Sequence, residues 1–236
     1  KGTYGKSIPY AEDKWTPGEG NWTQEIMDFE NIYQKYAIMT DATEETGNIK
    51  VVNAADYGIE ASSGEKMLSV TRYNTTSTSL KVFIPATLLN AAGMRDVPIE
   101  KWREVYLAFD MYNNGTELQY HTCWKTKAGR ASQSITQRIL RDKNNADRWT
   151  LMKSNYYTWP YPKTDKKWIT WRISLYELAF NSRNAVDAEY VTNPGDFIIN
   201  FASTKSGKDW EIFIDNVRLE AGPTVANGEQ VVVQFG

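Results

Sequence analysis

Cysteine and histidine are nearly absent from this chain of 236 residues, which contains one of each. The single cysteine, Cys123, excludes an internal disulfide bond and, within a β-rich stretch, is typical of a small buried hydrophobe. Catalysis by a Ser/His/Asp or Cys/His arrangement needs an imidazole, and only His121 could supply it. The same scarcity disfavours a zinc site, because paired histidines and Cys-x-x-Cys spacing are missing.

Excess charge and long apolar runs are missing as well. The formal net charge is −2, so the chain has no general attraction for nucleic acid, whose non-specific binding depends on a basic surface. No apolar run approaches the roughly 18 residues of a membrane-spanning helix, and no glycine-rich phosphate loop is present. We therefore expect neither a nucleic-acid partner nor a membrane span.

Aromatic residues, by contrast, are abundant, with nine Trp and fourteen Tyr. That number exceeds what the packing of a domain of this size requires. Tryptophan and tyrosine offer flat apolar faces with a polar edge, which suits a binding surface as well as a core.

Short β-rich runs between Gly, Asn, Asp and Pro turns dominate the chain from about residue 24. In one of them Val105, Leu107, Phe109 and Met111 share one face, which predicts that this face is buried. Helix candidates are short and few. The pattern predicts an all-β antiparallel sandwich with little helix. The predicted strands are Glu25–Ile32, Asn48–Ala54, Lys66–Tyr73, Ser79–Pro85, Glu104–Tyr112, Leu118–Lys125, Arg148–Lys153, Trp168–Leu175, Asp196–Ala202 and Trp210–Leu219, and the helix candidates are Ala86–Ala92 and Leu175–Phe180.

The strand pattern also predicts how the chain is divided. Residues 1–23 are polar and rich in Gly and Pro, which indicates an extended lead-in. Residues 24–221 carry the sandwich. Residues 222–236 begin with Gly-Pro and end in a new β-like run, so we expect a linker and the start of a following segment, with further domains joined to the chain.

Four segments, in their order and spacing, resemble the galactose-binding-like jelly roll of carbohydrate-binding modules of families such as 4, 11, 22 and 30. The resemblance covers about residues 24–221. It implies a jelly-roll β-sandwich and non-catalytic binding of a polysaccharide or oligosaccharide. The segments are Met27–Asn31, Gly64–Val70, Leu107–Asn113 and the pair Trp168–Leu175 with Ile212–Leu219, the last containing Ile-Asp-Asn-Val.

The resemblance further implies a structural calcium ion. Carried over by position, its ligands are the side chains of Glu30 and Asp215, completed by backbone oxygens near Gly64 and Lys66. Calcium binds six to eight hard oxygen ligands in irregular geometry, and it would explain two carboxylates in apolar strands. The alternative is that Asp215 caps a turn with Asn216.

Sugar binding pairs aromatic platforms with polar side chains that form hydrogen bonds. On the strand face opposite the core, the candidates are Tyr106, Asp110 and Tyr112, and Arg72 is a further one. Asn113-Asn114-Gly115 predicts a hairpin to the next strand. That partner contributes Trp124 and Tyr120 with one parity, or His121 and Gln119 with the other, and both parities stay open.

The loop Asn155–Pro162 is the densest aromatic cluster and contains Tyr157 and Trp159. Its prolines restrict it at low entropic cost, which suits a presented binding platform. The competing interpretation is a hydrophobic lid over one end of the sandwich.

The sequence thus favours a calcium-stabilised carbohydrate-binding module, secreted or at a bacterial cell surface. One alternative is a glycoside hydrolase or polysaccharide lyase, since Glu211 and Asp215 lie four apart in one strand and so on one face. The other is a structural or adhesion sandwich without a glycan site.

Overall fold

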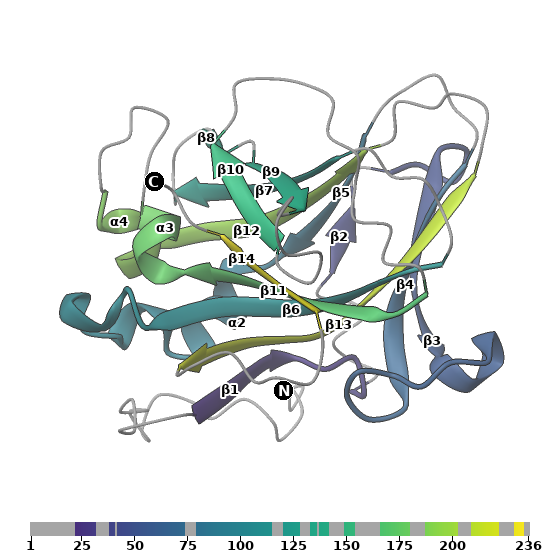
Figure 1. Cartoon of the computed structure of the whole chain (residues 1–236), viewed down its shortest axis with the longest axis horizontal. Helices are drawn as coiled ribbons and strands as arrows, with labels where there is room; N and C mark the ends of the chain where they lie inside the picture. Colours follow the sequence, from purple (N-terminus) through teal and green to yellow (C-terminus); the bar gives the residue numbers. More distant parts are fainter. Residues whose placement is uncertain are drawn as a thin grey trace, which may run out of the picture.

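The structure, a computed structural model, describes residues 22–31, 38–40, 42–73, 79–114, 120–127, 133–135, 137–141, 149–153, 166–179, 187–202, 209–221 and 229–233. Two β-sheets make up most of this part of the chain, as Figure 1 shows. The prediction of an all-β sandwich with little helix is confirmed.

Among the described residues, sheet A has nine strands and sheet B has five. In hydrogen-bonded order, sheet A consists of β3 (Gly47–Asn53), β4 (Lys66–Arg72), β13 (Trp210–Ala221), β6 (Val105–Asn113), β11 (Trp168–Ser174), β14 (Glu229–Val233), β10 (Trp149–Lys153) and β9 (Gln137–Arg141), with β1 (Trp22–Met27) also paired to β13. Sheet B consists of β2 (Met39–Thr40), β5 (Ser79–Ile84), β12 (Pro194–Ala202), β7 (Tyr120–Lys127) and β8 (Gln133–Ile135).

The core lies between the two sheets and is built by alternation. In β6 the side chains of Val105, Leu107, Phe109 and Met111 are at most 1% exposed and join one apolar cluster, so the predicted buried face is confirmed. Strand β5 of the opposite sheet contributes its own alternating residues to that cluster. Period-two alternation therefore decides which side of each strand faces the core.

Helices are short and lie beside the sheets. In the described part of the chain they are α2 (Ala86–Ala91), α3 (Leu175–Ala179) and α4 (Glu189–Thr192), with 3-10 turns η1 (Ala54–Tyr57), η2 (Met94–Asp96) and η3 (Ile99–Lys101). Figure 1 shows α3 and α4 together at one end of the sandwich. None of the helices in the described ranges is long and apolar enough to span a membrane.

Strand β13 organises sheet A, because β4 pairs with its first half and β1 with its second half. Ile212, Phe213 and Ile214 are all fully buried, since both faces of the strand are covered at this point. The pairing with β6 shifts register between Asp215 and Arg218. This bulge re-aims the polar side chains around it.

One sequence prediction fails in the sheet topology. The predicted hairpin between residues 104–112 and 118–125 is wrong: β6 lies in sheet A and β7 in sheet B, so the Asn-Gly step does not join paired strands. The described strand pairs are mostly antiparallel, as predicted, and β14 alone among the described strands runs parallel to its neighbours, β11 and β10. Glu229–Val233 pair with β11 and β10 in sheet A, and the division of the chain into domains stays a prediction.

Candidate functional site

The outer face of sheet A, where the sequence predicted part of a sugar site, is covered. Tyr112 is 6% exposed and belongs to a second apolar cluster with Met67 and Phe213. Its ring meets Trp168 edge-on with centroids 5.5 Å apart, and the Trp168 indole N–H donates to the Glu60 carbonyl at 2.9 Å. Turn η1 and the following loop therefore seal this face, and Tyr112 serves packing.

Asp110 is 4% exposed, and internal donors surround both of its carboxylate oxygens. Oδ1 accepts hydrogen bonds from the Thr170 hydroxyl at 2.7 Å and from Arg218 Nη1 at 3.1 Å. Oδ2 accepts from the Asn216 amide at 3.1 Å and from the hydroxyl of Ser62. With these partners Asp110 stabilises the fold and has no exposed surface to offer a sugar.

Asp215 is the direct register neighbour of Asp110 and is fully buried. Its Oδ2 accepts the Ser63 N–H at 2.8 Å, and its Oδ1 accepts the Asn216 N–H at 2.7 Å. Burial raises the pKa of Asp215 to about 7, and the charge of Asp110 adds to this, although the N–H donors oppose it. Among the described residues Asp215 forms no ion pair. It is a buried acid without a cationic partner of its own.

The predicted calcium ligands gather around one loop. Glu30 Oε1 accepts hydrogen bonds from the backbone N–H groups of Glu65, at 2.7 Å, and of Lys66. The Lys66 ammonium also forms an ion pair with Glu30 Oε2, at 3.4 Å. Burial alone would raise the pKa of Glu30, but these N–H bonds and the Lys66 charge hold it below its ordinary value. Gly64 has φ +64°, and a Cβ there would lie 2.6 Å from Glu30 Oε1.

Glu30 and Asp215 thus hold residues 62–66 from two sides, as the resemblance placed them. Within the described ranges no three His, Cys, Asp or Glu residues form a group that could hold a metal ion. Backbone oxygens would therefore have to supply most of a calcium shell. The calcium site stays a prediction.

The remaining predicted sugar ligands lie apart from one another. Arg72 is 6% exposed and takes the register position between Gly47 and Trp210. Tyr106 is half-buried, on the strand position that pairs with Ser174. Tyr157 and Trp159 fall outside the described residues. The structure does not bring Arg72 and Tyr106 into one exposed site.

Strand β7 carries Trp124 and His121, and its register resolves their parity. Trp124 pairs with Ile198 of β12, while Cys123 pairs with Ile199, which is part of the core. Trp124 therefore occupies a position on the outer face of sheet B. His121 lies two residues from Cys123 and so shares the core-facing side of the strand with it. Of the two parities that the sequence left open, register selects the one that includes Trp124.

A row of register-paired positions, apolar in four of its five strands, crosses sheet B on that outer face. Register pairs link Met39 to Phe83, Phe83 to Ile198, Ile198 to Trp124 and Trp124 to Ser134, one residue from each strand. We call these five positions the outer row. Met39 is 52% exposed, Phe83 is half-buried and Ile198 is 5% exposed. Neighbouring rows place Lys81 with Asn200 and Thr122, and Ser79 with Ala202 and Tyr120.

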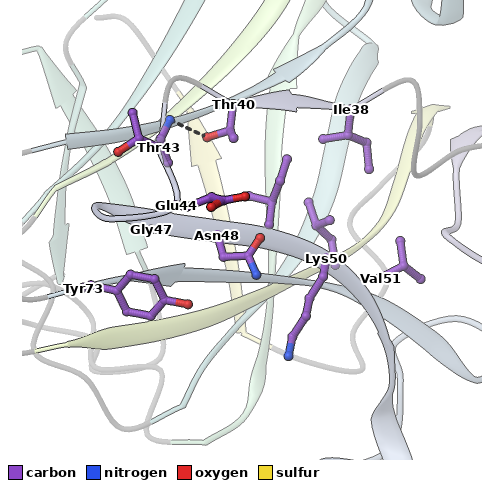
Figure 2. Close-up of a pocket in the computed structure, with 12 residues that line it drawn as sticks. Ile38, Thr40, Thr43, Glu44, Gly47, Asn48, Lys50, Val51 and Tyr73 are labelled. Atoms are coloured by element: carbon purple, nitrogen blue, oxygen red, sulfur yellow. Dashed lines mark hydrogen bonds between the residues drawn. The ribbon is translucent and has the colours of Figure 1, made fainter.

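A pocket of about 720 Å³ lies between the edge strands of the two sheets, β2 and β3, and we call it the edge groove. Figure 2 shows Ile38, Thr40 and Thr43 on one side of it and Asn48 and Lys50 on the other. Leu68 reaches it from β4, and Tyr73, just beyond β4, also lines it. Its size is within the range typical of small-molecule sites.

Sequence reasoning missed Met39, Phe83 and the edge groove. Met39 lies in a strand of two residues, too short for any periodicity. Phe83 alternates with Val82 and Ile84, so the parity signal was present, but nothing in the sequence shows that β5 and β7 share β12 as a neighbour.

No family model and no curated protein matches this chain. Among solved structures it is similar to a family 11 carbohydrate-binding module from Clostridium thermocellum in complex with a β-1,3-1,4-mixed-linked tetrasaccharide. That likeness covers 89% of this chain and 100% of the module, at 13% identity and a TM-score of 0.46. A second likeness is to a structure of promiscuous carbohydrate-binding modules of the β-sandwich superfamily. It covers 85% of this chain and 62% of the other chain, at 16% identity and a TM-score of 0.47.

An exo-β-agarase is similar over 89% of this chain, at 12% identity and a TM-score of 0.43, and the chain spans 26% of that enzyme's length. At such identities no sugar-binding residue of these proteins carries over to this chain. The function therefore rests on the chain's own residues.

Proposed function

We propose that this chain binds polysaccharide without cleaving it, through the outer face of sheet B. The observation that carries the proposal is the outer row, whose apolar positions lie in four of the five strands described in sheet B, namely β2, β5, β12 and β7. A secreted or cell-surface setting, where polysaccharides occur, is part of the same proposal.

The chemistry of this face suits a sugar chain. Apolar and aromatic positions, with Phe83, Trp124 and Tyr120 among them, match the C–H faces of sugar rings. The polar positions Lys81 and Asn200 lie between the apolar rows and suit the ring hydroxyls.

Binding is favoured over hydrolysis by the positions of the acids. Glu211 and Asp215 lie roughly 13 Å apart along their strand, which is more than the separation that paired glycosidase carboxylates use. Asp110 and Asp215 do lie side by side, but both are buried beneath residues 62–63. Neither arrangement offers an acid pair to a bound sugar.

The decisive experiment is affinity electrophoresis and calorimetry of the full chain against a panel of polysaccharides. We expect binding without product release, and at least about tenfold weaker binding after Trp124→Ala or Phe83→Ala. Ile99→Ala is the matched control, because Ile99 is an apolar side chain 64% exposed outside this face. Unchanged affinity in both outer-row variants would refute the site. Binding to no glycan would favour an adhesion sandwich, and released sugar would favour an enzyme.

We also propose that a calcium ion binds beside residues 62–66, with Glu30 and Asp215 as its charged ligands. Support comes from Asp215, whose buried carboxylate lacks an ion-pair partner among the described residues and would gain one. The test is the melting temperature with calcium and with chelator. We expect chelator to lower it in the wild type and to have no effect in Asp215→Asn. A chelator-insensitive wild type would refute the calcium site.

A further inference from the structure

The edge groove exists because one strand is too short to cover another. Ile49 and Val51 hold core-facing positions of β3, yet both are only half-buried. Their neighbours at the same level on β4, Leu68 and Val70, are 1% and 0% exposed. The opposite edge of sheet B is β2, which is only two residues long. A strip of the core therefore stays accessible between the sheet edges.

Gly47 marks the closed end of this strip. A Cβ at Gly47 would lie 2.8 Å from Leu80 Cδ1 of sheet B and 2.6 Å from the Thr71 carbonyl oxygen. The two sheets are thus in close contact at Gly47, and the groove follows β3 from there to Val51. Four residues of strand span roughly 13 Å, enough for a short oligomer but not for a folded partner.

Polar residues also line the groove: Asn48 and Lys50 alternate with Ile49 and Val51 along β3, so they lie on the other side of this edge strand. Among the described residues, the side chains of Asn48, Lys50, Glu44 and Tyr73 form no hydrogen bond or ion pair, so a ligand can use them without breaking any such contact. Lys50 and Glu44 carry opposite charges, which gives the rim no net charge. An apolar floor with hydroxyl, amide and oppositely charged groups beside it matches a neutral ligand with C–H faces and many hydroxyls.

We infer that the edge groove is a second carbohydrate site, which takes a short stretch of a neutral oligosaccharide. The inference rests on the proposed function in that both sites bind glycan, but the two use different residues. Asn48 and Tyr73 supply hydrogen bonds to ring hydroxyls, and Ile49 and Val51 contact the C–H face of a sugar ring.

The test is calorimetry of the full chain with neutral oligosaccharides, and with acidic ones for comparison. We expect two sites per chain in the wild type and one after Tyr73→Ala, with Asn48→Ala weakening that same site about threefold to tenfold. Asn53→Ala is the matched control, an exposed asparagine of the same strand outside the groove lining. Melting curves check that each variant folds. If Tyr73→Ala does not fold, Asn48→Ala still tests the groove, because Asn48 is exposed.

The outcomes separate the two proposals. A single site that Trp124→Ala removes and the groove variants leave unchanged overturns the edge groove while the outer row stands. A single site that only the groove variants remove supports the edge groove and overturns the outer row. A preference for acidic oligosaccharides, or binding to no glycan at all, overturns the inference.

Discussion

Asp215 makes the stability of the fold depend on pH in an unusual direction. Its pKa is about 7 in the folded chain against 3.8 for an ordinary aspartate. The folded state therefore holds a proton that the unfolded state releases. The stability from this group is fully present below the unfolded pKa and is lost as pH rises through the folded pKa.

The size of the loss follows from the same two values. Between about pH 5 and pH 6 the folded state binds close to one more proton than the unfolded state, so unfolding becomes easier by about 1.4 kcal/mol per pH unit. At pH 7 the folded carboxyl is about half ionised and the slope is about half as steep, so the loss from pH 5 to pH 7 is about 2 kcal/mol. Asp215→Asn removes this titration. The amide replaces an oxygen that accepts an N–H group, so we expect a separate loss of about 1–3 kcal/mol that does not vary with pH.

Urea unfolding, followed by tryptophan fluorescence in the presence of chelator, measures both effects. We expect the wild type to lose stability from about pH 5 to about pH 8 and the variant to show a slope shallower by about 1 kcal/mol per pH unit. Glu25, whose pKa burial and Asp28 also raise to about 7, titrates in both proteins and so cancels in the comparison. Parallel pH profiles for wild type and variant would contradict the assignment of this titration to Asp215.

Three further substitutions test the architecture around the sheets. Gly64→Ala places a Cβ against the Glu30 carboxylate at a left-handed φ and should cost about 2 kcal/mol in urea unfolding; an unchanged midpoint would contradict it. Arg218→Met leaves Asp110 without its cation, 3.1 Å away, and should cost about 3–5 kcal/mol, with a loss under about 1 kcal/mol as the opposing result. Leu80→Ala empties a fully buried position and should cost about 2–5 kcal/mol by thermal and urea unfolding, and a surface-like effect would place Leu80 outside the core.

The strands could be predicted from the sequence because alternation and turn residues are local signals. The predicted run 104–112 differs from β6 by one residue at each end, and the run 66–73 from β4 by one. The apolar face of β6 could be predicted equally well, because Val105, Leu107, Phe109 and Met111 occupy every second position of the run. Local pattern is sufficient where the partner strand does not matter.

The site could not be assembled from the sequence, because it depends on which strands pair. A local Asn-Gly signal favoured a hairpin, whereas β6 and β7 lie in different sheets. Asp110 and Tyr112 have the composition of a sugar site and lie on the predicted face. They are buried because residues 54–65, distant in sequence, fold over them. Coverage of a sheet face is a tertiary property that strand parity does not contain.

Both sheets carry aromatic and apolar residues on their outward faces, and on sheet A a described segment covers them. On sheet A the outward-facing Tyr112, Phe213 and Asp110 contact η1 and the loop after it, and this contact fixes residues 62–66 onto β13. On sheet B the outer row includes Phe83, which is half-buried, and Met39, which is 52% exposed. Aromatic and apolar residues on an outward face are costly to leave in water unless a ligand covers them. Within the described ranges, η1 and its loop cover the outward face of sheet A around Tyr112, whereas Met39 and Phe83 on sheet B and Ile49 and Val51 in the edge groove stay partly open, and these are the surfaces where we expect sugar to bind.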